Sequence, residues 1–541
     1  MEKISLPGVF LMKIVSGEKM GQLDRLTMTR FGIPGLILME NAGLQVVRFI
    51  QRIRPDRKQG QIVIFCGRGN NGGDGFVIAR HLRQLGYHVE TWAMGSVSDY
   101  KGDAAVNYNI LLKRGHKVSS IGADNPVESI KDLRAADLIV DALLGTGIQR
   151  QVDQPFAEVI TAINNSLATK VAVDIPSGIS ADSGEIMGVA VRAHYTVTFA
   201  LPKRGLMLFP GAEYAGRLLV ADIGIPEELT SQAEIKENLI TGNYVHSQLP
   251  PRILDSHKGS YGRLLILAGS PGMTGAAALA GEAALRGGAG LVYLGTAAEL
   301  QPVLEAKLKE VIVLGFPGDG DGNLTVGGMS EILEHARSCQ ALALGPGLKA
   351  GLETLNLLKS LAGEISVPVV VDAGGVSALA LEPNFLKEVN VPFILTPHPG
   401  EMARLLGGTI TGVQQERWSL AARWAREWQV VLVLKGAYTV IALPGGEIYI
   451  NPTGNPVLST AGTGDLLTGL IAALAAQGLE AEKAAICGTY LHGLAADLLA
   501  ARSGQRGNKA GDILDFFPAA LNETAGLPPA EPGEYFYVRP Y

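Results

Sequence analysis

The chain has 541 residues and is 47% hydrophobic, so it is long and apolar enough for two large folded domains. Its formal net charge of −6 argues against a nucleic-acid-binding protein, which normally carries a clustered basic surface. An anionic ligand would therefore have to be held by local features such as helix N-termini.

The three cysteines, Cys66, Cys339 and Cys487, lie far apart and match neither a metal-ligand spacing nor a disulfide framework. The apolar stretch near the N-terminus is interrupted by Lys13 and is too short to cross a membrane. We therefore expect a cytoplasmic protein without a signal peptide, in a compartment that keeps its thiols reduced.

Strand-like and helix-like segments alternate through the first half of the chain. Apolar, β-branched runs predict the strands, and amphipathic runs predict the helices between them. This repeated order predicts an α/β fold with a mainly parallel sheet flanked by helices. The expected strands are 61–66, 88–94, 136–142, 170–175, 195–200 and 217–223, with helices at 75–85, 103–114 and 153–163.

A second series of the same kind begins after residue 260. Residues 226–260 show no clear alternation and contain three prolines, so we expect them to connect two domains, 1–225 and 261–520. Residues 521–541 are predicted to form an extended, proline-rich tail. The expected strands are 263–268, 291–295, 341–344, 367–372, 392–395 and 430–434, with helices at 275–286, 464–476 and 481–499.

A glycine-rich segment, CGRGNNGGDG, covers residues 66–75 between an expected strand and the next helix. Glycines at a helix N-terminus allow backbone N–H groups to approach a phosphate closely. The glycine spacing does not match GxGxxG, so we assign no standard dinucleotide fingerprint. A sharp turn without a ligand is the alternative, although a turn needs fewer glycines and asparagines than this.

Two later strand ends carry polar loops, DALLGTG at 141–147 and DIPSG at 174–178. Ligands bind at the carboxyl ends of parallel strands, so these loops should converge with the glycine-rich segment. Asn71, Asp141 and Ser177 would then offer oxygen atoms that suit a hard cation. Each aspartate taken alone is as readily explained as a capping residue.

NNGGDG, DALLGTG and DIPSG, in this order, resemble the NAD(P)H-hydrate epimerase family, as do Met20…Asp24 and the LMENAG segment at 38–43. The likeness covers roughly residues 12–225 and implies a Rossmann-like domain. It implies that Asn71, Asp141 and Ser177 hold a potassium ion. We expect Asp174 to be the acid/base group because a carboxylate at a strand end can move a proton at the hydrated ring. The implied contacts to the hydrated nucleotide are Asn70, Asn71, Gly72, Gly73, Asp74, Gly145, Thr146, Gly147, Ile148, Gln149, Arg150, Gln151 and Asp174.

A related domain occurs in eukaryotic decapping-enhancer proteins, where it serves as a binding and dimerisation module. Its fold alone therefore does not imply catalysis. The intact asparagine, aspartate and serine set favours an active enzyme here. A non-catalytic N-terminal module that only supports the second half remains as an alternative.

In the second half, STAGTGD at 459–465 opens an apolar helix. Small residues at a helix start expose N–H groups that can hold a phosphoryl group and stabilise its charge. Asp465 is placed to accept a proton from a substrate hydroxyl. An ordinary capped helix start is the alternative, and no GxxxxGK[ST] segment supports a P-loop.

GTGD at the start of a late helix resembles the ribokinase-like superfamily. GSPGMTGAA, GPGL, DAGG, TPHPGEMAR and KGAYT, in order between residues 269 and 439, are similar to the ADP- or ATP-dependent NAD(P)H-hydrate dehydratase family. The likeness covers roughly residues 245–515. It implies nucleotide contacts from Lys435, Gly436, Ala437, Tyr438, Thr439 and Gly464, and substrate contacts from Ala276, Gly347, His398 and Asp465.

These resemblances imply ADP or ATP as co-substrate, with magnesium bridging the phosphates. Phosphorylation would turn a ring hydroxyl into a good leaving group, and an epimerase beside the dehydratase would make both epimers usable. The motifs do not separate ADP from ATP, but the fused arrangement favours ADP. A ribokinase-like kinase acting on another small molecule is the alternative. We expect a homo-oligomer with no nucleic-acid or membrane partner.

Overall fold

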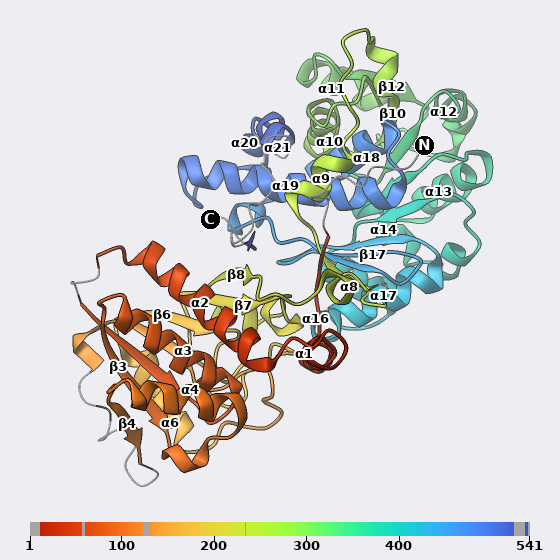
Figure 1. The fold of residues 1–541 in the computed structure, drawn as a ribbon. Coiled ribbons are helices and arrows are strands. Elements are labelled where there is room, and N and C mark those ends of the chain that lie inside the picture. The colour runs from red at the N-terminus through yellow and green to blue at the C-terminus, as the bar shows by residue number, and fades with distance from the viewer. Residues whose placement is uncertain are drawn as a thin grey trace. The chain divides into compact units, whose positions relative to one another are not determined.

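The structure, a computed structural model, describes residues 11–56, 60–122, 130, 133–232, 234–523 and 536–538. Two compact α/β units are present (Figure 1). The N-terminal unit contains Lys13–Ile235 and the segment around residues 536–538. The C-terminal unit contains Met12 and the chain from Lys236 to residue 523. The predicted fold class, two domains with mainly parallel sheets flanked by helices, is confirmed.

The N-terminal unit is built on an eight-stranded sheet. Its strands are β2 (Gln61–Cys66), β3 (His88–Met94), β4 (Val118–Ile121), β5 (Ala136–Ala142), β6 (Thr169–Val173), β7 (Tyr195–Phe199), β8 (Arg217–Ala221) and β19 (Phe536–Tyr537). The spatial order is β19-β8-β7-β6-β5-β2-β3-β4, and every pair is parallel except β19 with β8.

Helices cover this sheet because their apolar faces need burial against it. They are α1 (Gly17–Arg30), α2 (Gly35–Ile53), α3 (Asn70–Gln84), α4 (Gly102–Lys113), α6 (Phe156–Asn165), α7 (Gly211–Tyr214) and α8 (Glu227–Thr230). The sequence analysis did not assign α1 and α2, although Ser16 is a regular N-cap that accepts from the backbone N–H of Lys19.

Helix α3 begins five residues before the predicted start at residue 75, so the two asparagines form its first turn rather than a preceding loop. A side chain at Gly72 would clash with the carbonyl of Gly67, so this tight strand-to-helix turn requires glycine. The turn places Asn70 and Asn71 at the carboxyl end of β2.

Strand order reverses between β2 and β5 in this sheet. The chain runs outward from β2 through β3 to β4, and then restarts at β5 on the other side. The loops after β2 and β5 therefore leave in opposite directions and open a crevice at the carboxyl ends of both strands. Such a switch point is where open α/β sheets bind ligands.

The C-terminal unit is built on an eleven-stranded sheet with the order β1-β9-β18-β17-β16-β15-β14-β13-β10-β11-β12. From β16 to β12 the pairs are parallel, whereas β16, β17 and β18 are antiparallel neighbours. The strands are β1 (Met12–Lys13), β9 (Glu237–Leu239), β10 (Arg263–Leu267), β11 (Leu291–Ala297), β12 (Ile312–Phe316), β13 (Ala341–Leu344), β14 (Val369–Val371), β15 (Phe393–Leu395), β16 (Val431–Leu434), β17 (Val440–Ala442) and β18 (Ile448–Ile450).

Helices flank this sheet as well, and its order reverses between β10 and β13. The helices are α9 (Gly242–Gln248), α10 (Thr274–Arg286), α11 (Gln301–Lys307), α12 (Met329–Ala336), α13 (Leu352–Glu364), α14 (Ala373–Leu379), α15 (Pro399–Leu406), α16 (Ile410–Gln415), α17 (Arg417–Trp428), α18 (Thr463–Ala476), α19 (Ala481–Ser503), α20 (Ala510–Leu514) and α21 (Phe517–Glu523).

Two segments carry more structure than the sequence analysis expected. Residues 226–260, expected to be a linker, contain α8, β9 and α9, and β9 pairs with β18 inside the C-terminal sheet. The tail contains β19, which extends the N-terminal sheet beyond β8. In both places a strand of two or three residues is added at or near a sheet edge.

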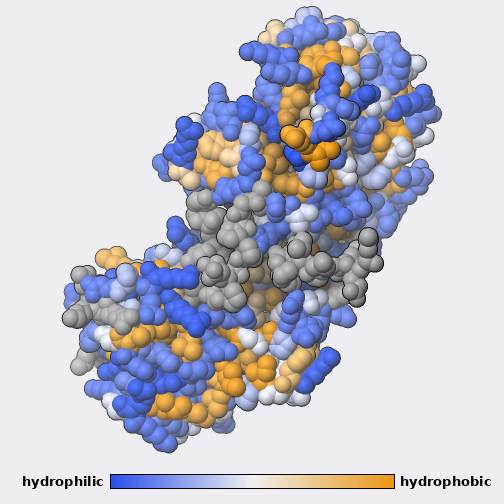
Figure 2. Space-filling model, turned by 45° about the horizontal axis from the view of Figure 1, so that its top comes forward, coloured by the Kyte–Doolittle hydropathy of each residue, from blue (hydrophilic) through white to orange (hydrophobic). Residues whose placement is uncertain are grey.

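Helix α19 is long and apolar enough to cross a membrane, but 78% of its apolar window is buried inside the fold. It packs on α18 in the core of the C-terminal unit and is a core helix. The three cysteines are buried and free. Hydrophilic and hydrophobic residues are mixed on the face shown in Figure 2, and the most exposed hydrophobic side chains, Leu167 and Leu254, lie in loops.

Candidate functional site

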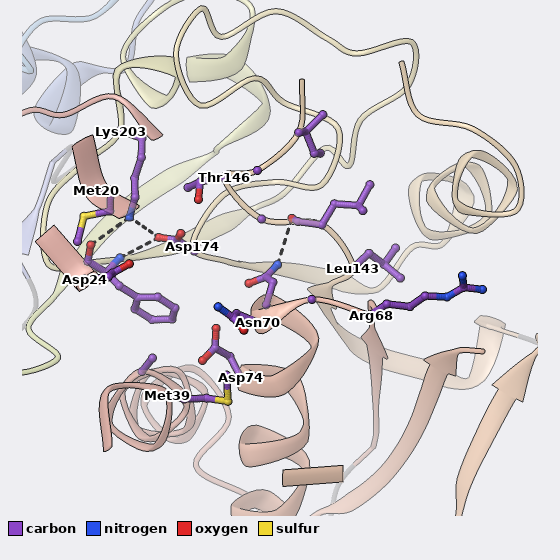
Figure 3. A pocket seen from close by; sticks show the side chains of 18 of the residues that line it. Met20, Asp24, Met39, Arg68, Asn70, Asp74, Leu143, Thr146, Asp174 and Lys203 are labelled. Atoms are coloured by element: carbon purple, nitrogen blue, oxygen red, sulfur yellow. Dashed lines mark hydrogen bonds and ion pairs between the residues drawn. The ribbon is translucent and has the colours of Figure 1, made fainter. Parts of the chain in front are cut away.

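A pocket of about 930 Å³ opens at the switch point of the N-terminal sheet (Figure 3). The predicted residues that line it are Asn70, Asn71, Asp74, Gly145, Thr146, Gly147, Ile148, Gln149, Arg150, Gln151 and Asp174. Gly72 and Gly73 do not line it: Gly72 packs against Gly67, and a side chain at Gly73 would meet Met39. These two glycines shape the turn that holds the pocket residues.

Asp174 follows β6 with its backbone in the left-handed region, at φ 65°, which is uncommon for a residue with a Cβ. Its Oδ1 accepts hydrogen bonds from Lys203 Nζ at 2.5 Å, Thr198 Oγ1 at 3.1 Å and the Phe199 N–H at 3.1 Å. Lys203 is 1% exposed and lies in the loop after β7. The carboxylate of Asp174 is therefore fixed in place at the pocket wall.

Two more carboxyls line the same pocket, Asp24 from α1 and Asp74 from α3. Burial raises the pKa of Asp24 to about 6; nearby Lys203 opposes this rise and Asp174 adds to it. Burial, followed by the Asp174 and Asp24 charges, raises the pKa of Asp74 well above its usual value. One lysine thus lies among three carboxyls that cannot all be charged.

The residues predicted to hold a cation are joined by a chain of hydrogen bonds. Asn71 Nδ2 donates to the Leu144 carbonyl at 3.1 Å, the Leu144 N–H donates to Ser177 Oγ at 2.8 Å, and Ser177 Oγ donates to Asp141 Oδ1 at 2.5 Å. Asp141 is fully buried, and burial raises its pKa to about 6 despite the hydrogen bonds from Ser177. Asn71 Oδ1 is buried and has no partner among the described residues, so this oxygen is available to a ligand.

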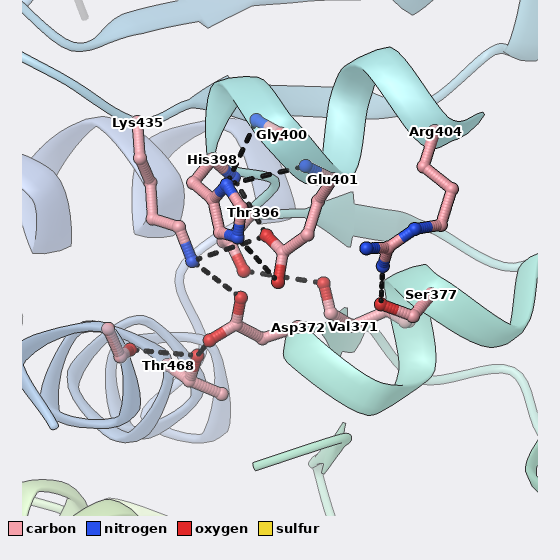
Figure 4. A network of polar contacts seen from close by, with 11 residues as sticks. Val371, Asp372, Ser377, Thr396, His398, Gly400, Glu401, Arg404, Lys435 and Thr468 are labelled. Carbon is pink, nitrogen blue, oxygen red and sulfur yellow. Dashed lines mark hydrogen bonds and ion pairs between the residues drawn. The ribbon is translucent and has the colours of Figure 1, made fainter. Parts of the chain in front are cut away.

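The C-terminal unit gathers its polar residues where β14, β15 and β16 end (Figure 4). Lys435 Nζ lies 2.7 Å from Asp372 Oδ1 and 3.9 Å from Glu401 Oε2. Thr468 Oγ1, from α18, donates to the second oxygen of Asp372 at 2.8 Å. Burial would lower the pKa of Lys435, but the charges of Asp372 and Glu401 outweigh it and raise that pKa.

Asp465 lies in the first turn of α18, where backbone N–H groups have no intrahelical partners. Burial, together with the charges of Asp372 and Glu401, raises the pKa of Asp465 to about 7 against the opposing charge of Lys435. Gly462, at the N-cap, has φ 94°, which permits the turn that leads into the helix. A carboxyl that titrates near neutrality beside free amide donors suits proton transfer coupled to phosphoryl binding.

The remaining predicted residues of this unit lie around that cluster. His398 is the N-cap of α15: its Nδ1 accepts from the N–H groups of Gly400 and Glu401, and its imidazole is 56% exposed. Gly347, with φ 66°, lies in the loop after β13 and closely approaches Ala276 of α10. Gly436 and Ala437 are exposed after β16, Tyr438 is buried, and Thr439 Oγ1 donates to the Gly436 carbonyl. Gly464 lies beside Lys435 at the start of α18.

The predicted site residues did not include Asp24, Lys203 or Arg68 in the first pocket, nor Asp372 or Glu401 in the second cluster. Asp372 directly follows β14 and Lys203 lies in the loop four residues after β7, so the rule that identified the other loops also applies to them. Asp24 lies on a helix before β2, the first strand of the N-terminal sheet, and does not follow a strand end of that sheet.

Comparison with known proteins covers both units. A family model described as NAD(P)H-hydrate dehydratase matches residues 264–519, and one described as YjeF-related protein N-terminus matches residues 35–205. The bifunctional NAD(P)H-hydrate repair enzyme of Moorella thermoacetica is 47% identical over 516 residues, covering 94% of this chain and 97% of the relative. That of Escherichia coli is 36% identical over 489 residues, covering 90% and 89%.

A crystal structure of the ADP/ATP-dependent NAD(P)H-hydrate dehydratase of Bacillus subtilis, co-crystallised with ATP and Mg²⁺, is 34% identical. It covers 52% of this chain and 97% of its own chain, with a TM-score of 0.46. The full-length relatives confirm both resemblances found in the sequence. The chain belongs to the family of bifunctional NAD(P)H-hydrate repair enzymes.

Proposed function

We propose that this chain repairs hydrated NADH and NADPH, with an epimerase site in the N-terminal unit and a nucleotide-dependent dehydratase site in the C-terminal unit. The observation that carries the proposal is the pair of buried clusters at the two sheets' carboxyl edges, each with one lysine and three carboxyls. Each cluster contains the aspartate that the sequence predicts to be catalytic, Asp174 in the first and Asp465 in the second.

In the dehydratase site, Asp465 accepts the proton of the ring hydroxyl while the hydroxyl oxygen attacks the terminal phosphoryl group of ADP or ATP. The N–H groups at the start of α18 stabilise the charge on the transferred group. The phosphorylated oxygen then leaves as phosphate and the neighbouring ring carbon loses a proton, which restores the dihydronicotinamide. Lys435, held by Asp372, lies beside Gly464 where it contacts the nucleotide phosphates.

In the epimerase site, the pocket of about 930 Å³ is large enough for a nicotinamide nucleotide. Asn70 and the loop 145–151 bind the substrate, and Asp174 moves a proton at the hydrated ring. The fixed geometry of Asp174, with three donors on a single oxygen, supports this assignment.

A potassium ion fits beside this pocket. Asn71 contributes its unpartnered Oδ1, and Asp141 and Ser177 contribute oxygens that are already connected to it through Leu144. A monovalent cation would neutralise the buried Asp141 carboxylate and hold the loops after β2, β5 and β6 in register.

A magnesium ion would bind at the dehydratase site mainly through the phosphates of the nucleotide that it accompanies. Asp372, Glu401 and Asp465 are carboxyls gathered around the single cation Lys435 within the described cluster. No group of three or more His, Cys, Asp or Glu side chains in the described residues is arranged to hold a metal ion, so these carboxyls would add ligands to a divalent ion that the nucleotide phosphates hold. Fusion with an epimerase favours ADP as the co-substrate.

The two activities are complementary because hydration produces two epimers at one ring carbon, and a dehydratase selective for one of them would leave the other unrepaired. We place the enzyme in the cytoplasm as a homo-oligomer. Three buried free thiols support a reducing compartment, and symmetric oligomers are common among soluble enzymes.

The test is to incubate the purified protein with a mixed-epimer preparation of hydrated NADH, K⁺, Mg²⁺ and ADP or ATP, and to follow the absorbance of restored dihydronicotinamide. Nucleotide-dependent recovery of nearly the whole pool is expected. Recovery of about half would remove the epimerase assignment, and no recovery with either nucleotide would favour a kinase for another small molecule.

A further inference from the structure

The epimerase pocket contains an acidic residue that the proposed function does not use, Asp24. It projects from α1 toward the side of the pocket that holds Asp174 and Lys203 (Figure 3). Lys203 Nζ donates to Asp174 Oδ1, to the Phe199 carbonyl at 3.0 Å and to Thr198 Oγ1 at 3.1 Å. Its three hydrogens are therefore occupied, and none is left for Asp24.

The two carboxyls are close enough to influence each other but have opposite environments. Asp174 Oδ1 receives three donors, among them an ammonium group, and its Oδ2 has no partner within the described residues. Asp24 has no hydrogen bond or ion pair within that part of the chain. The charges around Asp24 are Lys203, Asp174, Arg25 and Asp74, and burial outweighs them, which raises its pKa to about 6. Asp174 is therefore positioned as a base, and Asp24 beside it is available as an acid.

Epimerisation of the substrate needs a base and an acid together. Hydrated NADH carries its hydroxyl on a ring carbon that is also bonded to the ring nitrogen. Inversion at that carbon requires one of its two polar bonds to break and re-form on the other face. Loss of hydroxide breaks the carbon–oxygen bond, whereas ring opening breaks the carbon–nitrogen bond. Ring opening needs a base at the hydroxyl and an acid at the nitrogen at the same time.

We propose that epimerisation proceeds by ring opening, with Asp174 as the base at the hydroxyl and Asp24 as the acid at the ring nitrogen. Asp174 removes the hydroxyl proton, the oxygen lone pair forms a carbonyl, the carbon–nitrogen bond breaks, and Asp24 protonates the departing nitrogen. The open aldehyde rotates about its carbon–carbon bond. Asp24 then takes the nitrogen proton back, the nitrogen attacks the other carbonyl face, and Asp174 returns its proton to the oxygen. No atom is gained or lost, and no oxidant is needed.

Asp24 fits the acid role better than Asp74, the third carboxyl. A group that donates and then recovers a proton works best when its pKa lies near the working pH, as that of Asp24 does. Burial also raises the pKa of Asp74, and this side chain projects from α3 next to Asn70 (Figure 3). This assignment rests on the proposed epimerase function of the pocket.

The first test needs no variant. The intact protein is incubated with each separated epimer of hydrated NADH in ¹⁸O-labelled water, with K⁺ and without nucleotide. Mass spectrometry then measures the label in the inverted product, and the spontaneous rate is subtracted. Ring opening retains the original oxygen, so inversion should outpace label uptake at least tenfold. Uptake of one labelled oxygen per inversion would show loss of hydroxide and overturn the mechanism.

The second test compares Asp24→Asn with Glu18→Gln, which removes a carboxylate from the exposed side of the same helix. Removing a general acid should lower kcat for epimerisation by about 10²- to 10⁴-fold with little change in KM, whereas the control keeps its rate. Asp24→Glu retains a carboxyl and should have a kcat at least tenfold higher than that of Asp24→Asn. It also serves as the second variant if Asp24→Asn does not fold. A kcat for Asp24→Asn equal to the control would exclude Asp24 as the acid.

The outcomes separate this mechanism from the function on which it rests. If the intact protein does not interconvert the epimers, the epimerase function and the mechanism fail together. If it does, and Asp174→Asn abolishes interconversion while Asp24→Asn leaves it unchanged, the epimerase function stands and the ring-opening assignment of Asp24 fails.

Discussion

The two polar clusters of this protein contain the same kinds of side chain but pair them differently. In the N-terminal unit the buried lysine binds the catalytic aspartate directly, Lys203 to Asp174. In the C-terminal unit Lys435 binds a supporting aspartate, Asp372, and leaves Asp465 without an ion pair. In each unit the lysine fixes the position of the carboxyl that it binds, whereas a carboxyl that it does not bind, Asp24 or Asp465, has a pKa raised toward neutrality.

This difference matches the chemistry that each site has to perform. A reversible inversion at one carbon needs a constant base that returns its proton. A phosphoryl transfer needs a base that removes a proton once per turnover, beside donors for the developing charge. The pKa of Asp465 near 7 suits the second task, and the ion pair of Asp174 suits the first.

The sharpest way to separate the sites is Asp465→Asn. This variant keeps the size of the side chain but removes the base, so dehydration should fall by about 10²- to 10⁴-fold. Epimerisation in the same molecule should be unchanged, which provides an internal control for folding. Restored absorbance with ADP and chromatography of the epimers measure the two activities. A fall of less than tenfold in dehydration would show that Asp465 is not the base.

The next largest expected effect is the loss of unfolding free energy when the lysine of either cluster is replaced. Lys203→Met leaves the Asp174 carboxylate without its ammonium partner, and breaking a buried pair on one side costs about 3 kcal/mol of unfolding free energy. Lys203 is 1% exposed and Lys435 is 19% exposed, so Lys435→Met should cost less. Urea unfolding of each variant measures both values. The double variant Lys203→Met/Asp174→Asn should recover part of the loss, and failure to do so would mean that lysine packing, not charge, stabilises the site.

The two sites should also respond to pH in opposite directions. Asp465 acts in its deprotonated form and has a pKa of about 7, so kcat/KM for dehydration should rise as the pH increases through 7 and fall about tenfold per pH unit well below it. Asp24 acts in its protonated form and has a pKa of about 6, so epimerisation should decline above that value. Parallel profiles for both activities would contradict the assignment of separate groups.

The smallest expected effect is that of potassium. An ion that binds only the folded N-terminal unit stabilises it by about 1.4 kcal/mol at ten times its dissociation constant. Thermal unfolding in KCl and in choline chloride should show this shift, and Asn71→Ala should remove it because Asn71 Oδ1 loses its place in the site. A shift that persists in Asn71→Ala would place the ion elsewhere.

Some elements were predicted to the residue, and the exceptions have common causes. Strands 61–66, 88–94, 136–142 and 341–344 match β2, β3, β5 and β13 because each is a continuous apolar run that the sheet buries. Strands β9, β17 and β18, of three residues each, were missed because so short a run carries no periodicity, whereas the equally short β14 and β15 fall within the expected strands 367–372 and 392–395. The early start of α3 was missed because Asn and Gly have low helix propensity.

The sites were predictable where a strand end supplied the signal. Asp174 and the loop 145–151 follow strands, and both line the pocket. Asp24 was not predictable in this way because only the packing of α1 brings it to the pocket. The state of each carboxyl was not predictable either, since it depends on which one receives the lysine, a contact that the fold alone creates.

The short strand β19 has a consequence for how the gene can be divided. It covers the outer edge of β8, and the N–H of Val538 donates to the Leu218 carbonyl at 3.0 Å. A gene fragment that stops at Ile235 would encode every parallel strand of the N-terminal sheet but leave the β8 edge open to pairing with another molecule. Exchanging the first half of the gene between relatives would therefore require transferring the codons of the last few residues as well. We expect these two distant segments of the gene to be inherited together.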